Sequence, residues 1–215
     1  MTKRRSFVPA LGVHWLTAIY DPLIRGWSAA RKLRASVIDA LELQPGMRLL
    51  ELGAGPGRLA IQIKQQHPAV SIDTVDADVS MVARAHRNAS KAGLEITVHE
   101  GDMTQLPDLG TFDRVYSTMT FHHLAPEAKS TALAEARRVL RPGGRFVVGD
   151  FGRPRDPLQW ALFAWFQQPL DGFANTRPHR DGRYERAVRE AFAHVRSAAA
   201  WRSIAGTLEV FVCTP

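Results

Sequence analysis

The sequence predicts an α/β fold: a doubly wound, mostly parallel sheet of seven strands, with helices on both faces and an antiparallel strand pair at its C-terminal end. Three observations lead to this prediction. Short apolar runs alternate with helical patterns between residues 47 and 152, the first run ends in a glycine-rich loop, and two β-rich runs lie near the end of the sequence. In such a sheet, ligands bind at the carboxyl ends of the strands.

Five short runs in the central part are typical of strands, because they are apolar or alternating and end at turn residues. They are residues 47–52, 71–76, 95–100, 112–117 and 145–150. Between them, residues 58–66, 79–92 and 127–140 carry apolar side chains at helical spacing. Pro142-Gly143-Gly144 is expected to stop the last of these helices. Residues 47–152 therefore form the predicted ligand-binding core.

The two ends of the chain have a different pattern. Residues 1–46 are expected to form a helical cap that serves as a substrate lid. Residues 153–215 are expected to complete this lid and then the sheet, all within a single domain. Their predicted parts are an apolar segment at 158–166, a polar loop at 172–183, a helix at 184–192, and strands at 195–201 and 207–213.

Composition excludes several classes of protein. The 215 residues are 45% hydrophobic and 23% charged, which is typical of a globular domain and not of a disordered or collagen-like chain. The one cysteine, Cys213, excludes an intrachain disulfide and a cysteine-based metal cluster, and we predict no metal site. No apolar run approaches the roughly 20 residues that span a bilayer. Residues 1–5 lack the apolar core of a secretory signal, so we expect a cytoplasmic protein.

The net charge of +7 is unevenly distributed. Residues 47–150 carry twelve basic and twelve acidic side chains, whereas residues 1–46 carry seven and three, and residues 151–215 carry nine and six. A basic excess suggests a nucleic acid, an anionic membrane surface or an acidic small molecule as partner. Because the excess lies outside the central core, it bears on the partner and not on the fold.

The strongest motif is the loop after the first predicted strand, Glu51-Leu52-Gly53-Ala54-Gly55-Pro56-Gly57. Glycines let a ligand approach the backbone closely, and the following helix N-terminus favours an anionic group. The spacing is G-x-G-x-G, and Arg58 stands where a dinucleotide fingerprint needs its third glycine. A nicotinamide oxidoreductase is therefore not expected.

Two acidic positions follow at the ends of the next strands. Asp76 comes about twenty residues after the loop, where a carboxylate accepts hydrogen bonds from ribose hydroxyls. Asp102 and Met103 follow the third strand, where an acid would bind a base amino group and the methionine would pack on the ring. Each alone is also compatible with a surface turn.

With these motifs in order, the sequence resembles a class I S-adenosylmethionine-dependent methyltransferase, which has a Rossmann-like fold. The similar segments are LLELGAGPGRLA, TVDADVSMVARA, EGDMTQLP, FDRVYSTMTFHHL and RVLRPGGRFVVGDF, which cover about residues 45–152. Within that family, the last segment and Tyr20-Asp21 are most similar to the ubiquinone and menaquinone biosynthesis methyltransferases and their relatives acting on small molecules.

The resemblance implies S-adenosyl-L-methionine as cofactor, with S-adenosyl-L-homocysteine as product. It implies that Glu51 orders the loop or the amino group, that Asp76 holds the ribose and that Ser117 lies near the sulfonium. The full set of implied cofactor residues is Glu51, Gly53, Ala54, Gly55, Gly57, Asp76, Ala77, Asp102, Met103 and Ser117. The pair Ala77-Asp78 departs from the family, where an apolar residue and serine are frequent, so Asp78 competes with Asp76 for the ribose role.

Methyl transfer from a sulfonium needs alignment and desolvation, and a base only where the acceptor must lose a proton. The candidate catalytic residues at strand ends are His122, His123 and Asp150. Alternatively, one histidine caps the next helix and the other packs against the cofactor cover.

The candidate substrate residues lie mainly in the two ends: Trp15, Tyr20, His122, Trp160 and His179. The aromatic segments near Trp15 and Trp160 either pack as core, or wall a pocket for a lipophilic acceptor, or touch a membrane surface. The basic loop around His179 would close over an anionic group or simply be solvated.

Three functions remain in competition. The first is methylation of a small, partly apolar or anionic molecule by a monomer or homodimer that is cytoplasmic or peripheral to a membrane. The second is RNA or DNA methylation, which is disfavoured because Ser117-Thr118-Met119-Thr120 stands where many amino-group nucleic-acid methyltransferases have an Asn-Pro-Pro-Tyr type tetrad. The third is a noncatalytic or regulatory protein that retains the cofactor fold.

Overall fold

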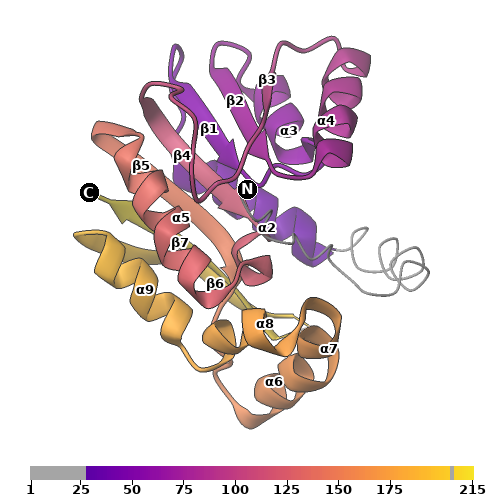
Figure 1. Ribbon diagram of the computed structural model, residues 1–215, viewed down its shortest axis with the longest axis vertical. Helices are drawn as coiled ribbons and strands as arrows, with labels where there is room; N and C mark the ends of the chain where they lie inside the picture. Colours follow the sequence, from indigo (N-terminus) through magenta and orange to yellow (C-terminus); the bar gives the residue numbers. More distant parts are fainter. Residues whose placement is uncertain (1–27, 204–205) are drawn as a thin grey trace, which may run out of the picture.

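A computed structural model describes residues 28–203 and 206–215. Its centre is one seven-stranded sheet with the order β3-β2-β1-β4-β5-β7-β6 (Figure 1). The strands are β1 (Arg48–Leu52), β2 (Ser71–Asp76), β3 (Thr97–Glu100), β4 (Phe112–Thr118), β5 (Leu140–Phe151), β6 (His194–Ser203) and β7 (Gly206–Thr214). The first five strands are parallel, whereas β7 runs antiparallel to both β5 and β6. The predicted fold class is therefore confirmed, including the C-terminal strand pair.

Helices cover both faces of this sheet. On one face, α2 (Ser28–Leu41) and α3 (Arg58–Gln66) bury side chains such as Val37 and Ile63 against Leu49 and Val147. The helix α4 (Val79–Lys91) contacts α3 and the strands β2 and β3. On the other face, α5 (Pro126–Arg138) and α9 (Arg183–Ala191) pack on residues such as Leu50 and Phe146. Apolar side chains alternate along the strands between the two faces, which is why both faces are buried.

The order of the strands defines where a ligand would bind. The chain runs outward from β1 to β2 and β3, and then returns to place β4 on the other side of β1. The carboxyl ends of β1 and β4 thus flank the topological switch point, where open α/β sheets bind their ligands. The side chain of Thr120, just after β4, reaches the loop after β1 and donates to the carbonyl oxygen of Gly53 over 3.1 Å.

Strand β5 begins earlier than predicted. It starts at Leu140, and the helix before it ends at Arg138, ahead of Pro142-Gly143-Gly144. The pairing with β4 is irregular there, because Phe112 pairs with Leu140 while Arg114 pairs with Arg145. Gly143 has a φ of +76°, a conformation that other residues rarely adopt. The proline and glycines therefore form a bulge inside a strand instead of ending a helix.

A group of short helices follows β5 and lies at the lower end of Figure 1. It consists of α6 (Pro157–Leu162), the π-helical turn η2 (Phe163–Gln167), α7 (Gln168–Asp171) and α8 (Phe173–Arg180). The predicted polar loop at 172–183 is thus wrong over most of its length. Its polar and turn-forming residues suggested a loop, but Thr176, Pro178 and His179 are buried and give the segment a packed helical face.

The apolar segment at 158–166 has a mixed role. Phe163 is fully buried and packs edge-on against Phe151, with ring centres 5.6 Å apart. Leu158, Trp160 and Trp165 are 63%, 50% and 80% exposed. Among the described helices, none has the length and apolar character that crossing a bilayer would require.

Candidate functional site

The glycine-rich loop connects β1 to α3 and contains three residues with positive φ: Gly53, Gly55 and Gly57. A side chain at Gly53 would collide with Thr120, whose Cγ2 lies 2.1 Å from the position of an added Cβ. A Cβ added to Gly55 would meet no atom within 4 Å. The loop therefore packs tightly against the end of β4 at Gly53 and presents open backbone at Gly55.

Asp76 ends β2 beside this loop. Its Oδ2 accepts a hydrogen bond from the Gly55 N–H over 2.6 Å, and its Oδ1 accepts one from the Asp78 N–H over 2.9 Å. Asp78 itself is the N-cap of α4, where its Oδ1 accepts from the Ser80 N–H over 2.8 Å. The two acids have different tasks in the structure: Asp76 holds the glycine loop, and Asp78 begins a helix.

The third strand ends at an exposed carboxylate. Asp102 follows β3, and its Oδ1 accepts hydrogen bonds from both the N–H and the hydroxyl of Thr104. Met103 is 6% exposed and belongs to the core on the α5 side of the sheet. Ala77, in the loop after β2, is exposed.

Glu51 and Ser117 lie beneath the loop and are buried. Glu51 Oε2 accepts a long hydrogen bond from the Tyr116 hydroxyl over 3.4 Å, and burial raises the pKa of Glu51 to about 8 although the Ala60 N–H and Tyr116 lower it. The hydroxyl of Ser117 is already bonded, since it donates to the Leu52 carbonyl oxygen over 2.8 Å. Both side chains therefore connect strand ends beneath the loop.

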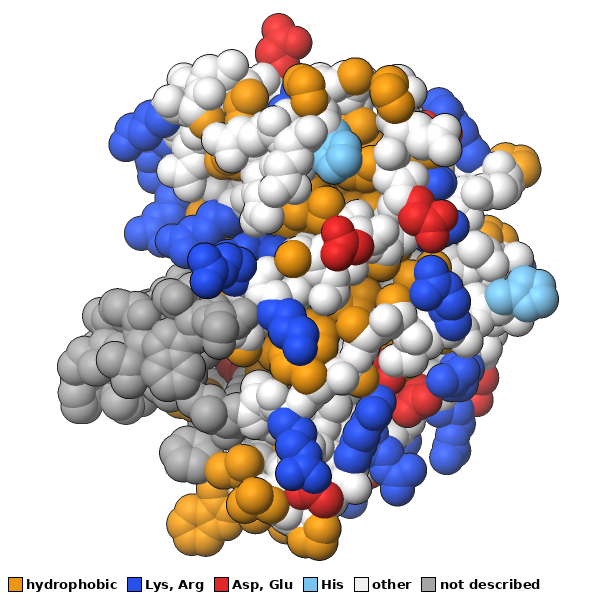
Figure 2. Space-filling model, turned by 180° about the vertical axis from the view of Figure 1, so that it is seen from behind, with side chains coloured by type: hydrophobic (Ala, Val, Ile, Leu, Met, Phe, Trp, Pro, Cys, Tyr) orange, Lys and Arg blue, Asp and Glu red, His pale blue; other side chains and the backbone are white. Residues whose placement is uncertain are grey.

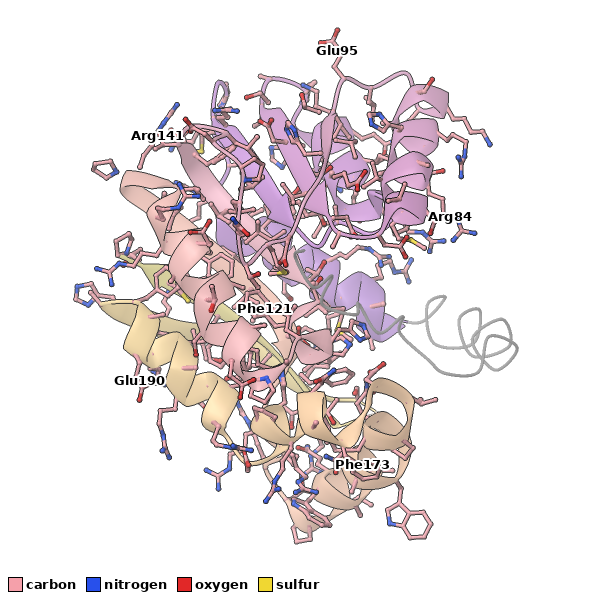
Figure 3. The ribbon with its side chains drawn as sticks, in the orientation of Figure 1. Arg84, Glu95, Phe121, Arg141, Phe173 and Glu190 are labelled. Carbon is pink, nitrogen blue, oxygen red and sulfur yellow. The ribbon has the colours of Figure 1, made fainter. Side chains whose placement is uncertain are left out.

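The candidate catalytic residues converge at the carboxyl ends of β4 and β5. His122 lies in the 3₁₀ turn η1 (Phe121–His123), and its Nδ1 is 2.7 Å from Asp150 Oδ1. Asp150 also accepts hydrogen bonds through Oδ2 from the backbone N–H groups of Thr120 and His122, over 3.1 and 3.3 Å. Figure 3 shows Phe121 in the middle of the molecule, where η1 meets α5. The pair of His122 and Asp150 is thus fixed in a buried environment.

A second carboxylate, Asp171, reaches the same cluster from the end of α7. Its Oδ2 lies 3.5 Å from His122 Nε2, and its Oδ1 lies 3.7 Å from His123 Nδ1. The Gln167 side-chain amide donates to Asp171, and the Asn175 amide donates to the His123 carbonyl oxygen over 2.9 Å. Asp171 is not predictable as a site residue, because nothing in its local sequence connects it with two histidines 48 and 49 positions earlier.

Charges in this cluster shift the ionisation of its members. Burial alone would lower the pKa of His122, but the charge and hydrogen bond of Asp150, with Asp171, raise it above the usual value. Burial alone would raise the pKa of Asp150, but His122 holds it well below the usual range. Burial raises the pKa of Asp171 and lowers that of Lys129 to about 8.

The Lys129 ammonium donates to the carbonyl oxygens of Phe121 and Leu124, which it holds in place.

The predicted substrate residues do not all join this cluster. His179 is 1% exposed, its Nδ1 lies 2.7 Å from the Phe151 carbonyl oxygen, and its ring stacks on Tyr184. It is thus a packed core residue in a helix, and the expectation that its segment is a loop, either closing over an anionic group or solvated, is wrong. Trp160 lies at the surface with the Arg180 guanidinium 5.1 Å from its ring centre. Trp15 and Tyr20 lie outside the described residues.

Comparison with known proteins adds independent information. Residues 49–144 match the family model described as a methyltransferase domain. The chain is 39% identical over 139 residues to a demethylmenaquinone methyltransferase of Thermus thermophilus, covering 63% of this chain and 62% of that protein. It is 32% identical over 157 residues to a ubiquinone/menaquinone biosynthesis C-methyltransferase of Bordetella avium, covering 71% and 60%. The chain thus spans less than two thirds of the length of these two relatives.

Solved structures agree on the architecture. The YcgJ protein of Bacillus subtilis superposes with a TM-score of 0.66 at 23% identity, covering 80% of this chain and 73% of that one. At this identity the likeness concerns the fold, and it supports the same arrangement of helices about a Rossmann-like sheet. The motif order, the strand order and the matched model together show a methyltransferase domain over residues 49–144 on a Rossmann-like sheet, in a chain that is similar in sequence to demethylmenaquinone and ubiquinone/menaquinone methyltransferases.

Proposed function

We propose that this protein transfers a methyl group from S-adenosylmethionine to a small, partly apolar acceptor. One observation carries the proposal: an open glycine backbone at Gly55 and the carboxylate of Asp76 meet at the carboxyl ends of two adjacent strands, beside the switch point of the sheet. A polar cofactor with a ribose needs both a backbone that it can approach closely and an acceptor for its hydroxyls.

The residues around Gly55 and Asp76 have side chains of the types that such a cofactor requires. Asp76 is the ribose ligand, because its carboxylate lies at the loop while the carboxylate of Asp78 caps a helix. Asp102 would accept from the adenine amino group, with Met103 beside the ring. Glu51 and Ser117 act from beneath, where they order the loop. The remaining positions line the site through their backbone and small side chains: Gly53, Ala54, Gly57 and Ala77.

When bound, S-adenosylmethionine supplies an electrophilic methyl group on a sulfonium. The chain's part is to align the acceptor with that methyl group and to exclude water. The acceptor approaches over the ends of β4 and β5, where the His123 side chain is 39% exposed while His122 and Asp150 are almost fully buried. His122 and Asp150 are then positioning residues that fix the η1 turn beneath the acceptor, and His123 is the residue that touches it.

The names of the relatives support a choice of acceptor. The two relatives are named for demethylmenaquinone and for ubiquinone/menaquinone biosynthesis. A hydroquinone or phenol with an apolar substituent is therefore the acceptor class to test first. Release of S-adenosylhomocysteine should rise with such a compound and not with transfer RNA or duplex DNA. Turnover with a nucleic acid alone would overturn this choice of acceptor, and no binding of the cofactor would overturn methyl transfer.

An anionic membrane surface is the proposed place where such an acceptor is met. Leu158, Trp160, Trp165 and Phe173 are all at least half exposed and belong to one group of short helices. Figure 2 shows apolar side chains gathered at the lower end of the molecule, with Lys and Arg side chains near them. Exposed aromatic side chains enter the lipid interface, and neighbouring cationic groups favour anionic headgroups.

A further inference from the structure

Three side chains in the cluster at the ends of β4 and β5 bring metal-binding atoms close to one another. They are His122, His123 and Asp171, and one ligand atom from each lies within 4.8 Å of the others. Around a tetrahedral zinc ion with bonds of about 2.0–2.1 Å, ligand atoms lie roughly 3.3 Å apart. Asp171 Oδ2 lies 3.5 Å from His122 Nε2 and Asp171 Oδ1 lies 3.7 Å from His123 Nδ1, so each carboxylate oxygen faces one imidazole nitrogen at a separation near that spacing. We propose that these three residues form a site for a divalent transition-metal ion such as Zn²⁺.

The groups behind the three ligands are those that a metal site requires. Asp150 Oδ1 lies 2.7 Å from His122 Nδ1, which leaves Nε2 of the same ring to face the centre. A carboxylate behind a histidine in this way fixes the tautomer and orients the ring of metal-binding histidines. Gln167 orients the Asp171 carboxylate through its side-chain amide, and Asn175 holds the backbone of His123. Each of the three ligands thus has its own support.

Charge balance also favours a cation at this point. Two carboxylates, Asp150 and Asp171, face the two nitrogen atoms of one imidazole, and their side chains are only 1% and 11% exposed. The ammonium of Lys129 is bonded to the carbonyl oxygens of Phe121 and Leu124, so it makes no direct ion pair with either carboxylate. A divalent cation would bind both imidazoles and the Asp171 carboxylate together and would place positive charge between the two carboxylates.

The proposed site has an open side. Two histidines and one carboxylate occupy three positions, and catalytic zinc sites keep a fourth for water or substrate. In the proposed site, the fourth position would lie on the side of His123, whose side chain is 39% exposed. Thr120 connects the site to the cofactor loop, because its backbone N–H binds Asp150 and its hydroxyl binds Gly53. An acceptor oxygen would fit the open position; this extension rests on the proposed methyl transfer, whereas the metal site itself does not.

Metal binding can be measured directly on the whole chain after treatment with a chelator. We expect calorimetry to give one Zn²⁺ per chain, and Co²⁺ in its place to give the visible absorption of a four- or five-coordinate ion. Asp171→Asn and His123→Gln should each weaken Zn²⁺ binding by tenfold or more, in line with the loss of a ligand. His86→Gln, which removes an exposed histidine on α4, is the matched control and should leave binding unchanged.

Two outcomes overturn the site. One is equal Zn²⁺ affinity in the wild type and Asp171→Asn. The other is a wild-type chain whose Co²⁺ sample has only the weak spectrum of the hexaaqua ion, and this readout does not depend on whether a variant folds. Titration of the same samples with S-adenosylhomocysteine separates the two proposals. A chain that binds S-adenosylhomocysteine but no metal supports methyl transfer and overturns the metal site. A chain that binds metal but no S-adenosylhomocysteine supports the metal site and overturns methyl transfer.

Discussion

The carboxylate of Asp76 accepts the N–H of Gly55 over 2.6 Å, so the end of β2 is bonded to the loop that follows β1. This hydrogen bond holds the Asp76 carboxylate beside the open backbone of Gly55. Its neighbour Asp78 points elsewhere, to the N-terminus of α4. On sequence alone, either acid could bind the ribose. Because their contacts differ in the structure, substitutions at the two positions should have different effects.

Asp76→Ala should weaken binding of S-adenosylhomocysteine by tenfold or more, because hydrogen bonds to a charged group contribute about 1.5–3 kcal/mol. Asp78→Ala should leave that affinity within about threefold and lower the free energy of unfolding by about 1 kcal/mol, the usual effect of losing a helix cap. Calorimetric titration and urea unfolding of both variants test this. The reverse pattern would assign the ribose to Asp78.

Gly55→Ala tests whether the open backbone is where the cofactor lies. Both Gly55 and Gly46 have positive φ, and an added Cβ meets nothing within 4 Å at either position. Alanine should therefore cost roughly 1 kcal/mol of folding stability at each, from the left-handed conformation alone. Only Gly55→Ala should abolish binding of S-adenosylhomocysteine. Equal affinity in the two variants would show that the cofactor does not approach Gly55.

The fold was predictable because its signals are local. The strand over 71–76 and the helix over 58–66 have the predicted bounds, since each is an uninterrupted apolar or amphipathic pattern. The segment 172–183 was mispredicted because its helix depends on burial of Thr176 and His179, which only the tertiary structure supplies. Adjacent histidines at strand ends suggested a site, but Asp171 is brought to them by packing of α7, and no spacing rule connects them.

Ser117→Ala separates a cofactor contact from a structural bond. The Ser117 hydroxyl is fully buried and donates to the Leu52 carbonyl oxygen. Removing it should lower the free energy of unfolding by about 1–3 kcal/mol, because a buried acceptor loses its partner. The affinity for S-adenosylhomocysteine should change by less than about twofold. A tenfold loss of affinity at unchanged stability would instead place the hydroxyl against the cofactor.

Trp165→Ser tests the proposed membrane contact. The Trp165 side chain is 80% exposed, and burial of a large apolar side chain contributes about 1.5–3 kcal/mol. The wild type should co-sediment with vesicles containing phosphatidylglycerol at low salt, and the variant should bind about tenfold more weakly. Val79→Ser is a suitable control, because Val79 is 59% exposed on α4, outside the group of short helices. Equal sedimentation of Trp165→Ser and the wild type would contradict the contact.

Glu51 makes stability depend on pH. Burial raises the pKa of Glu51 to about 8, whereas an unfolded chain leaves it near its ordinary value of about 4.3. The folded state therefore binds the Glu51 proton more tightly than the unfolded state does. The resulting contribution to stability is complete below a pH of about 4.3, the unfolded pKa, and is lost as the pH rises toward the folded pKa of about 8. The full effect is about 5 kcal/mol, from roughly 1.4 kcal/mol per pKa unit.

Glu51→Gln lacks this ionisation, because glutamine stays neutral throughout. Its free energy of unfolding should therefore rise relative to the wild type as the pH increases from 5 to 8. Urea unfolding of the variant and the wild type at several pH values measures this difference. A difference that stays flat with pH would mean that the folded protein does not raise the pKa of Glu51.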